Sequence, residues 1–174
     1  PEKSIQRLVA SGCRNLDIGV ESGSPRVLKL IKKDTTREVI RKANQRLSKY
    51  PIIIKYTFMG GFPTETVDEF LQTLDFRRIL QEENDFATCP IFFYTPFPGT
   101  AMFSLAIEHG FKPPTTLEEW AHFNYDTWYK KNPCWLSKKK IRLVENSVFL
   151  SYFSNKKLGY KYPNPLMRTL FNIY

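Results

Sequence analysis

The chain has 174 residues, of which 42% are hydrophobic and 25% are charged, so it is long enough for a globular domain and shows no low-complexity tract. The net charge of +9 comes from 26 Lys and Arg against 17 Asp and Glu, but the basic residues are spread along the chain, which favours solvated helix faces over a nucleic-acid surface. The 3 cysteines are widely separated, and no signal peptide or long apolar run is present, so we expect a reducing, cytoplasmic compartment and no membrane span.

The first third of the chain is predicted to form helices around one strand. A short amphipathic helix is expected to end at Gly12, because glycine is favoured just past a helix end, and a strand follows at residues 16–20. Ser24 and Pro25 are suited to the N-cap and first position of a second helix. A third helix is predicted at residues 36–49.

Residues 52–66 are predicted to form a strand, a glycine turn and the start of a helix. The run is β-branched and aromatic, as in a buried strand, and it breaks at Gly60 and Gly61. Thr64 is predicted as the N-cap of the helix that follows. In parallel α/β folds such a turn lies where ligands bind, and glycine lets a ligand approach the backbone; a turn needed for packing alone is the alternative.

A third unit of the same kind is predicted from a strand at residues 86–95 and a helix at 100–110. Strands that alternate with helices indicate a parallel sheet with right-handed crossovers, and three such units correspond to half of a barrel. The aromatic-rich residues 113–133 are interpreted as a covering loop with one helical turn or as an unrecognised strand, and an amphipathic helix is predicted at 137–154. We therefore expect one domain at residues 1–112 and an aromatic-rich loop with a C-terminal helical extension at 113–174, including a last helix after Pro165.

A few polar side chains are candidates for chemistry by their position. Glu21 directly follows a predicted strand, where a carboxylate can accept hydrogen bonds from two sugar hydroxyls; capping the next helix is the alternative. Lys32 or Lys33, near a helix end, could reach a ligand carboxylate. His122, among aromatic residues, is a better site candidate than His109, which precedes a glycine at a helix end. No metal-ligand spacing is visible.

Three blocks of sequence occur in order at the predicted strand tips: residues 12–24 (GCRNLDIGVESGS), 28–36 (LKLIKKDTT) and 58–66 (FMGGFPTET). In sequence and spacing they resemble the second half of the core of radical S-adenosylmethionine (radical SAM) enzymes. A fourth block, residues 96–100 (PFPGT), with the helix and acidic segment after it, resembles the subgroup that carries an N-terminal cobalamin-binding domain. The resemblance covers about residues 5–110.

The resemblance implies an α/β fold, half of a partial (β/α)6 TIM-like barrel with parallel strands, followed by C-terminal helices. It implies that a 4Fe-4S cluster binds S-adenosylmethionine (SAM) and cleaves it to a 5′-deoxyadenosyl radical, with the catalytic residues left unidentified. The family's Cys-x-x-x-Cys-x-x-Cys motif, which holds the cluster, is absent from this sequence. We therefore expect the cluster ligands in a missing N-terminal half that this chain must join to be active. The cobalamin-binding domain of the subgroup would also lie there, and whether cobalamin is used is left open.

The resemblance also implies which residues of this chain would bind SAM. Glu21 and Ser22 would hold the ribose hydroxyls, and Lys33 would pair with the methionine carboxylate. Thr64 stands where the family usually has glycine; because threonine does not easily take a positive φ, we expect the turn to differ and leave the role of Glu65 open. The positions around the adenine are Met59, Gly60, Gly61, Tyr94, Thr95 and Pro96.

The leading interpretation is a radical SAM enzyme for methyl transfer or a related reaction, whose small-molecule or lipid-like substrate is bound by the aromatic stretch at residues 92–129. A radical SAM tRNA-modifying methylthiotransferase is one alternative, and its binding to nucleic acid would weaken with salt. A non-catalytic α/β binding domain is another. Half a barrel would also leave an open edge at the strand of residues 16–20, so we expect the isolated chain to be poorly soluble or to dimerise across that edge.

Overall fold

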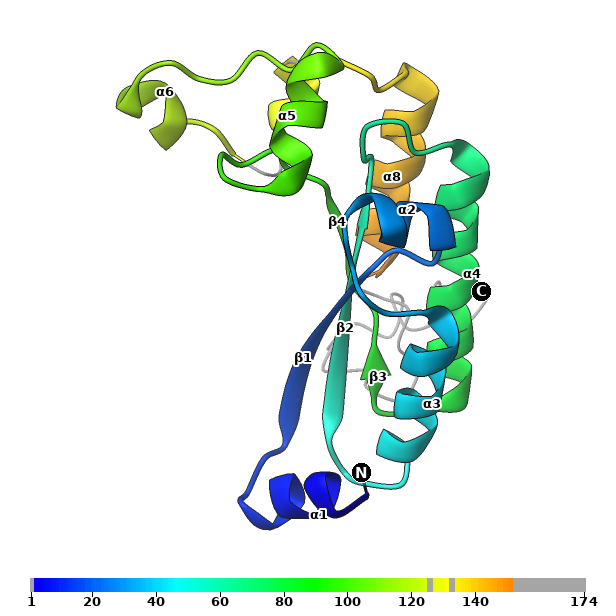
Figure 1. Cartoon of the computed structure of the whole chain (residues 1–174). Helices are drawn as coiled ribbons and strands as arrows, with labels where there is room; N and C mark the ends of the chain where they lie inside the picture. The colour runs from blue at the N-terminus through cyan, green and yellow to red at the C-terminus, as the bar shows by residue number, and fades with distance from the viewer. Residues whose placement is uncertain (1, 125–126, 132–133, 152–174) are drawn as a thin grey trace, which may run out of the picture.

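A computed structural model describes residues 2–124, 127–131 and 134–151 and shows strands flanked by helices (Figure 1). Strand β2 (Ile53–Gly60) pairs in parallel with β1 (Asn15–Glu21) on one side and with β3 (Ala87–Thr88) and β4 (Ile91–Phe93) on the other. The fold class predicted from the sequence, parallel strands alternating with helices and followed by a C-terminal helix, is confirmed.

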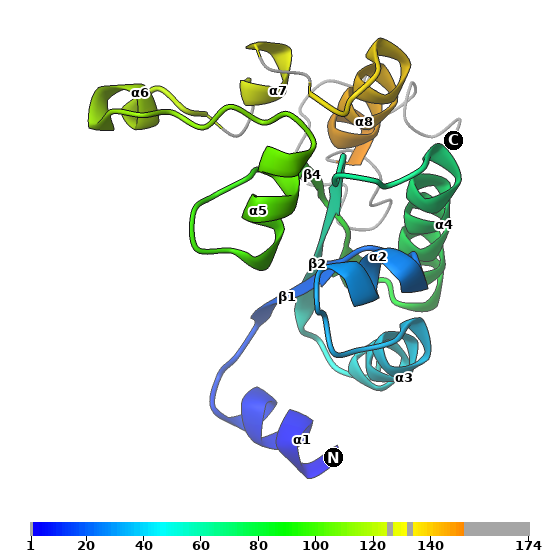
Figure 2. The same ribbon diagram turned by 45° about the horizontal axis from the view of Figure 1, so that its top comes forward.

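Strand β2 is the centre of the sheet and its residues alternate in burial. Ile54, Tyr56 and Phe58 are almost completely buried, whereas the residues between them are only partly buried. Because side chains alternate across a strand, one face of β2 is the core face and the other is more open. Helices α3 (Arg37–Leu47) and α4 (Val67–Glu83) lie along one side of the sheet in both orientations (Figures 1 and 2).

Helix α4 begins two residues later than the sequence suggested. The prediction of Thr64 as its N-cap was wrong: the N-cap is Thr66, whose hydroxyl accepts a hydrogen bond from the backbone N–H of Glu69. The Glu69 carboxylate in turn accepts from the Thr66 N–H, so the two residues form a capping box. Thr64 instead belongs to the turn before the helix, where it has a φ of 64°.

The third predicted strand, residues 86–95, is divided in the structure into β3 and β4. The interruption falls at Cys89 and Pro90, and proline has no N–H to donate to a neighbouring strand. The carbonyl oxygen of Pro90 still accepts a hydrogen bond from the N–H of Phe58, at 3.0 Å, so the pairing with β2 continues beyond the break.

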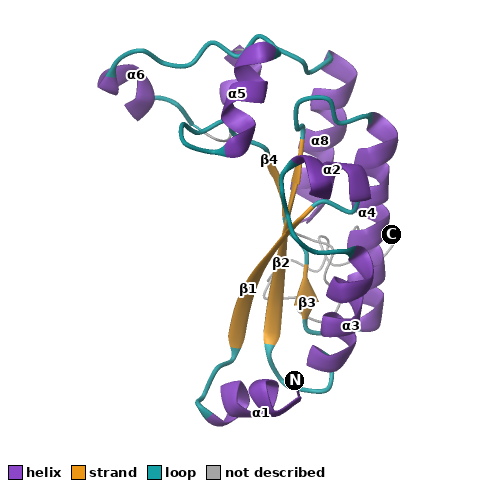
Figure 3. Ribbon diagram, in the orientation of Figure 1, coloured by secondary structure: helices purple, strands orange, loops and turns teal. Residues whose placement is uncertain are grey.

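The other helices lie near their predicted positions. The loop predicted at residues 113–133 contains two short helices and, within its described residues, no strand. The end of the helix predicted at 137–154 and the last helix after Pro165 lie outside the described residues. Figure 3 shows how helices and strands follow one another along the chain. The bounds are α1 (Glu2–Ala10), α2 (Pro25–Leu30), α5 (Ala101–Glu108), α6 (Leu117–Ala121), α7 (Trp128–Lys131) and α8 (Lys138–Ser151).

Helix α8 packs on the sheet even though it follows the predicted domain boundary at residue 112. The backbone N–H of Ile91 in β4 donates to the Ser151 hydroxyl at 3.0 Å, and Val144 of α8 belongs to the same buried core as Ile91. Strand β1, by contrast, has one neighbouring strand in the part of the chain that the structure describes, so the predicted edge lies there. No helix within the described residues is both long enough and apolar enough to cross a bilayer.

A chain of buried amides ties α3, α4 and the start of β3 together. Asn44, which is fully buried, donates through Nδ2 to the carbonyl oxygen of Leu80 at 2.9 Å. Its Oδ1 accepts from Nδ2 of Asn84 at 3.0 Å, and Oδ1 of Asn84 accepts from the N–H of Phe86 at 2.9 Å. Both amide side chains therefore have partners, as buried polar groups require.

We predict that Asn44→Ala destabilises the fold by about 1–3 kcal/mol, because it leaves the Leu80 carbonyl and the Asn84 amide buried without a partner. The free energy of unfolding, measured with urea, checks this result. Lys42→Ala, at an exposed position on the same helix, is the matched control and should change stability by less than about 0.5 kcal/mol. Equal stability of the Asn44 variant and the control would contradict the role given to the amide chain.

Candidate functional site

The candidate site lies at the carboxyl ends of the strands, where the tips after β1, β2 and β4 come together. Glu21 at the end of β1 is in register with Phe58 of β2, and Gly60 at the end of β2 is in register with Phe93 of β4. The N–H of Tyr94 also donates to the Gly60 carbonyl, at 2.9 Å. The three predicted loop tips are thus neighbours at the carboxyl ends of the strands, the usual position of a ligand site in parallel α/β folds.

Glu21 folds back over Gly19, and its carboxylate pairs with Lys33. The distance from Lys33 Nζ to Glu21 Oε1 is 3.3 Å. A Cβ atom at Gly19 would lie 2.2 Å from Glu21 Oε1 and 3.1 Å from Lys33 Nζ, so only glycine leaves room for the pair. Glu21 has a φ of 71°, and a register shift between Gly19 and Glu21 accompanies this bend of the chain. Lys32, the other lysine considered from the sequence, is exposed.

The second carboxylate oxygen of Glu21 is the most informative atom of the site. Oε2 is buried and has no hydrogen-bond partner. A buried charged acceptor without a partner is costly, because it has lost its water without gaining a donor. The other oxygen, Oε1, lies beside Lys33 and next to Gly19, so the same carboxylate keeps Oε2 available to accept a hydrogen bond from a bound molecule. We name Gly19, Glu21 and Lys33 the notch.

Ser22 is placed differently from its predicted role. Its side chain is completely buried, and its hydroxyl lies 3.1 Å from the Thr73 hydroxyl of α4 and accepts from the Ser24 N–H at 3.0 Å. The structure therefore uses Ser22 to fix the turn against α4 and does not bring its hydroxyl to the notch. Gly23, the next residue, would place a Cβ within 2.5 Å of the Gln72 carbonyl oxygen, so this turn is closely packed.

The glycines at the end of β2, Gly60 and Gly61, are needed for contacts and backbone conformations within the protein itself. A Cβ at Gly60 would lie 2.3 Å from Cε2 of Phe70, so a ring of α4 occupies the space that the sequence analysis considered for a ligand. Gly61 has a φ of 85°, which favours glycine. Its N–H donates to Glu65 Oε2 at 2.7 Å, and its carbonyl accepts from Trp135 Nε1 at 2.9 Å. At Gly60 the packing alternative is therefore what the structure shows.

The turn with Thr64 keeps a positive φ, contrary to the expectation that threonine would change it. Arg26 holds it: Nη2 donates to the Thr64 carbonyl at 2.8 Å and to Glu69 Oε2 at 2.7 Å, while Nε donates to Glu69 Oε1 at 2.5 Å. The hydrogen bond from Arg26 lowers the pKa of Glu69 to about 2, with the capping interactions of Thr66 contributing. Glu65 turns inward, and its side chain is completely buried.

The remaining predicted residues surround an apolar cluster beside the notch. Tyr94 is buried, with its ring 5.0 Å from that of Phe62, and burial raises the pKa of its hydroxyl to about 12. Met59 is partly buried and packs against the same cluster. Pro96 is buried, while Thr95 is half-buried and its hydroxyl donates to the Phe93 carbonyl at 3.3 Å. The structure thus brings Met59 and Tyr94 together, with Tyr94 directed into the cluster.

Comparison with known proteins identifies the family. The sequence model described as "Radical SAM superfamily" matches residues 1–77, which include the notch. Over these residues the chain belongs to the radical SAM superfamily. Two residues of the notch, Glu21 and Lys33, are among those that the resemblance had placed at the SAM ribose and carboxylate.

Curated relatives of this radical SAM chain carry transferase names. It is 34% identical over 106 residues to an uncharacterized methyltransferase of Pyrococcus horikoshii, covering 61% of this chain and 22% of that protein. It is 26% identical over 159 residues to the tRNA-2-methylthio-N(6)-dimethylallyladenosine synthase of Thermotoga petrophila, covering 90% of this chain and 29% of that protein. It is 37% identical over 95 residues to the bacteriochlorophyllide d C-12(1)-methyltransferase of Chlorobaculum tepidum, covering 53% of this chain and 20% of that protein. The chain spans less than a third of the length of each relative.

The described residues of the radical SAM chain do not fit an iron–sulfur cluster. Cys13, Cys89 and Cys134 form no disulfide, and no group of three or more Cys, His, Asp or Glu in the described ranges is placed to hold a metal ion. Burial raises the pKa of the Cys89 thiol to about 12, whereas cluster ligands are thiolates. The residues of the notch can bind and orient an organic ligand, and no step through a cluster is assigned to this chain.

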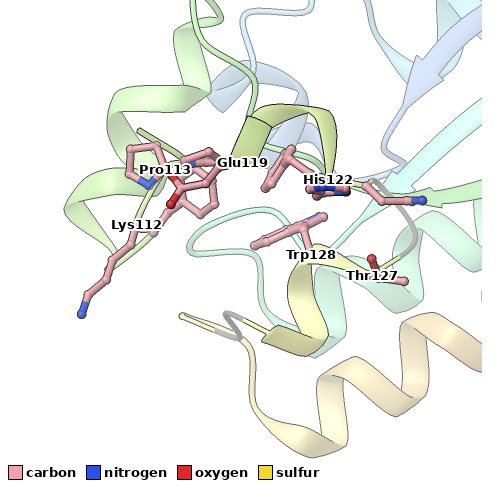
Figure 4. Close-up of a pocket in the computed structure, with 10 residues that line it drawn as sticks. Lys112, Pro113, Glu119, His122, Thr127 and Trp128 are labelled. Atoms are coloured by element: carbon pink, nitrogen blue, oxygen red, sulfur yellow. The ribbon is translucent and has the colours of Figure 1, made fainter. Parts of the chain in front are cut away.

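A separate pocket of about 400 Å³ lies in the aromatic stretch at residues 92–129, which we name the aromatic segment (Figure 4). Its walls are mostly apolar, and the close-up shows the Lys112 side chain extending away from it. Trp128 is 3% exposed, and its Nε1 is buried without a hydrogen-bond partner. His122, the histidine favoured from the sequence, also lines the pocket. The other lining residues are Phe111, Pro113, Pro114, Glu119, Phe123, Asn124 and Thr127.

We predict that Thr64→Gly stabilises the fold by about 0.5–1 kcal/mol. The αL conformation costs a residue with a Cβ about 1–2 kcal/mol. Ordering glycine costs roughly 0.5–1 kcal/mol more than ordering another residue, because glycine has more conformational freedom in the unfolded chain. Thr64 is exposed, so little packing is lost. Unfolding in urea checks this, with Thr66→Ala as the contrasting variant, since removing that N-cap should cost about 1 kcal/mol. Destabilisation by Thr64→Gly would show that the turn does not strain threonine.

Proposed function

We propose that this chain forms part of the SAM-binding site of a radical SAM enzyme that carries out methyl transfer or related radical chemistry. The observation that carries the proposal is the notch: one oxygen of Glu21 pairs with Lys33 beside Gly19, and the other is buried without a partner. The superfamily match over residues 1–77 and the transferase names of the relatives support it.

In this proposal the notch binds the ribose and the methionine carboxylate of SAM. Glu21 Oε2 accepts a hydrogen bond from a ribose hydroxyl, which supplies the donor that this buried oxygen lacks in the protein. Lys33, which lies 3.3 Å from Glu21 Oε1, is the cation that pairs with the methionine carboxylate. Met59 and Thr95 provide the surface for the adenine beside the strand tips. The chemistry of a bound 4Fe-4S cluster would be reductive cleavage of SAM, and this chain's part is to hold and orient SAM for it.

A second candidate function is methylthiolation of tRNA. The alignment with the Thermotoga synthase covers 90% of the chain and so includes α8 and the aromatic segment, although at only 26% identity. The methyltransferase alignments have higher identity but cover less of the chain. Mass spectrometry of the modified acceptor separates the two functions, because one adds a methyl group and the other a methylthio group.

A cobalamin cofactor and a cytoplasmic location are further parts of the proposal. The absorption spectrum of the purified full-length protein tests for cobalamin.

The acceptor substrate is proposed to lie against the aromatic segment. The pocket of about 400 Å³ has the size and the mainly apolar lining of small-molecule sites, with few polar groups. The unpartnered Nε1 of Trp128 provides a donor for an acceptor atom of such a molecule. A small-molecule or lipid-like substrate fits this lining better than a polyanion. An N-terminal half of the barrel, with or without a cobalamin domain, is the proposed partner that completes the site.

Substitutions in the notch test SAM binding in the full-length gene product. Glu21→Ala and Lys33→Ala should each weaken SAM binding by about tenfold or more, because each removes a charge-assisted hydrogen bond. Isothermal titration with SAM gives the Kd, and release of 5′-deoxyadenosine after anaerobic reconstitution gives turnover. Lys32→Ala, at the exposed neighbour, is the matched control and should bind SAM normally. Unchanged Kd values for both notch variants would place the site elsewhere.

Substitution in the pocket tests the proposed substrate side. His122→Ala should leave the Kd for SAM unchanged and lower turnover on the acceptor by raising its KM, since His122 lines the pocket and not the notch. Lys139→Ala, an exposed lysine of α8, should change neither quantity and serves as the control. Loss of SAM affinity in the His122 variant, or an unchanged KM for the acceptor, would contradict the assignment of the pocket.

A further inference from the structure

Two side chains from a single short segment reach the two ends of the loop that follows β2. Trp135 Nε1 donates to the carbonyl oxygen of Gly61 at 2.9 Å. Five residues later, Nζ of Lys140 in α8 donates to the carbonyl oxygen of Glu65 and lies 3.5 Å from Glu65 Oε2. The loop of residues 61–65 is therefore held at both ends from a part of the chain more than 70 residues away.

The Lys140–Glu65 pair is buried far more completely than the other ion pairs within the described residues. The side chain of Lys140 is 8% exposed and that of Glu65 is 0% exposed. Burial raises the pKa of Glu65 and lowers the pKa of Lys140, and each charge counteracts this effect on the other. Breaking a buried pair by removing one partner is strongly unfavourable, since the other is left as an uncompensated charge.

The carboxylate of this pair is also part of the loop itself. Glu65 Oε2 accepts the Gly61 N–H at 2.7 Å, so the same oxygen links the start of the loop to the Lys140 ammonium group. Glu65 Oε1 is buried without a hydrogen-bond partner, which leaves the carboxylate dependent on the contacts made by Oε2. The position of Gly61, with its φ of 85°, thus depends on the charge state and placement of Glu65.

Two further charged groups act on the pair. Glu69 of α4 favours the charged form of Lys140, and Arg26 of α2 opposes it. Arg26 and Glu69 are bound to each other, so their effects on Lys140 largely offset one another. Lys140 therefore remains the principal counter-ion of Glu65.

We propose that Trp135 and Lys140 form a clamp that fixes the loop of residues 61–65 and thereby sets the affinity of the site for SAM. Both are positioning residues, because they act through the loop. Gly60, which leads into the loop, is paired with Phe93 of β4 and lies two residues after Phe58, the partner of Glu21, so displacing the loop displaces the surface near Glu21. This inference rests on the proposed function and adds that residues after position 112 are required for SAM binding.

The clamp also connects the notch side of the molecule to the aromatic pocket. The rings of Trp135 and Trp128 have centroids 5.6 Å apart, and Trp128 lines the pocket. Trp135 is also 6.4 Å, centroid to centroid, from Tyr94 at the tip of β4. The residue that binds the Gly61 carbonyl thus lies between the two proposed binding regions.

Lys140→Met tests the clamp in the full-length gene product, because methionine keeps the side-chain length and removes the charge. We expect the Kd for SAM, measured by titration near neutral pH, to rise about tenfold, a typical coupling between a remote contact and a binding site. Lowering the pH should restore affinity in this variant, since protonation of Glu65 removes the unpaired buried charge. The double variant Glu65→Gln with Lys140→Met should recover most of the affinity and lose this pH dependence, because no buried charge remains. Lys139→Met, an exposed neighbour, is the matched control.

Trp135→Phe provides a second test that does not unbalance a buried charge, should Lys140→Met fail to fold. It keeps an aromatic ring and removes one hydrogen bond to Gly61, so SAM affinity should fall roughly fivefold. Thermal unfolding of every variant separates loss of fold from loss of affinity. Parent-like Kd values in the folded Lys140 or Trp135 variants, or a double variant no better than Lys140→Met, would overturn the clamp. Absence of SAM binding by the parent protein would instead overturn the proposed function.

Discussion

The parallel pairing of β2 on both of its sides is the constraint on which the rest of the structure depends. Because β1 and β4 run in the same direction as β2, all three end at one edge of the sheet. The buried face of β2, with Tyr56 and Phe58, anchors this arrangement against the helices. The open face is left for the notch, so the same alternation that forms the core also decides on which side a ligand can lie.

Glycine serves different purposes at neighbouring positions of this site. Gly19 leaves space for a charged pair of the site itself, whereas Gly60 leaves space for a ring of α4. Gly61 provides a backbone conformation that side chains rarely adopt. A sequence motif containing several glycines therefore combines a binding requirement, a packing requirement and a conformational requirement, and only the coordinates assign each to its residue.

The fold and part of the site could be predicted because they depend on local patterns. Strand alternation and glycine or proline breaks located the strands, and family resemblance selected Glu21 and Lys33, which the structure brings into contact. The start of α4 was misplaced, although the spacing of Thr66 and Glu69 already contained a capping box. The buried position of Ser22 could not be predicted because its partner, Thr73, is distant in sequence, and the direction of a side chain in a turn depends on such partners.

The role of Lys140 could not be predicted from the sequence, and the reason is physical. In a lysine-rich segment such as residues 138–140, three adjacent side chains look equivalent, but only Lys140 is turned inward by the helix. Its burial is tolerable because a carboxylate 75 residues earlier is buried opposite it, and that carboxylate is in turn held by the N–H of Gly61. We expect a buried charge pair of this kind to contribute less to stability than to the choice of one arrangement, since a loop position that separates the pair would leave a buried charge unpaired. The helix after the aromatic segment is thereby linked to the turn after β2, and the two parts of the chain that the sequence suggests separating share one set of buried contacts.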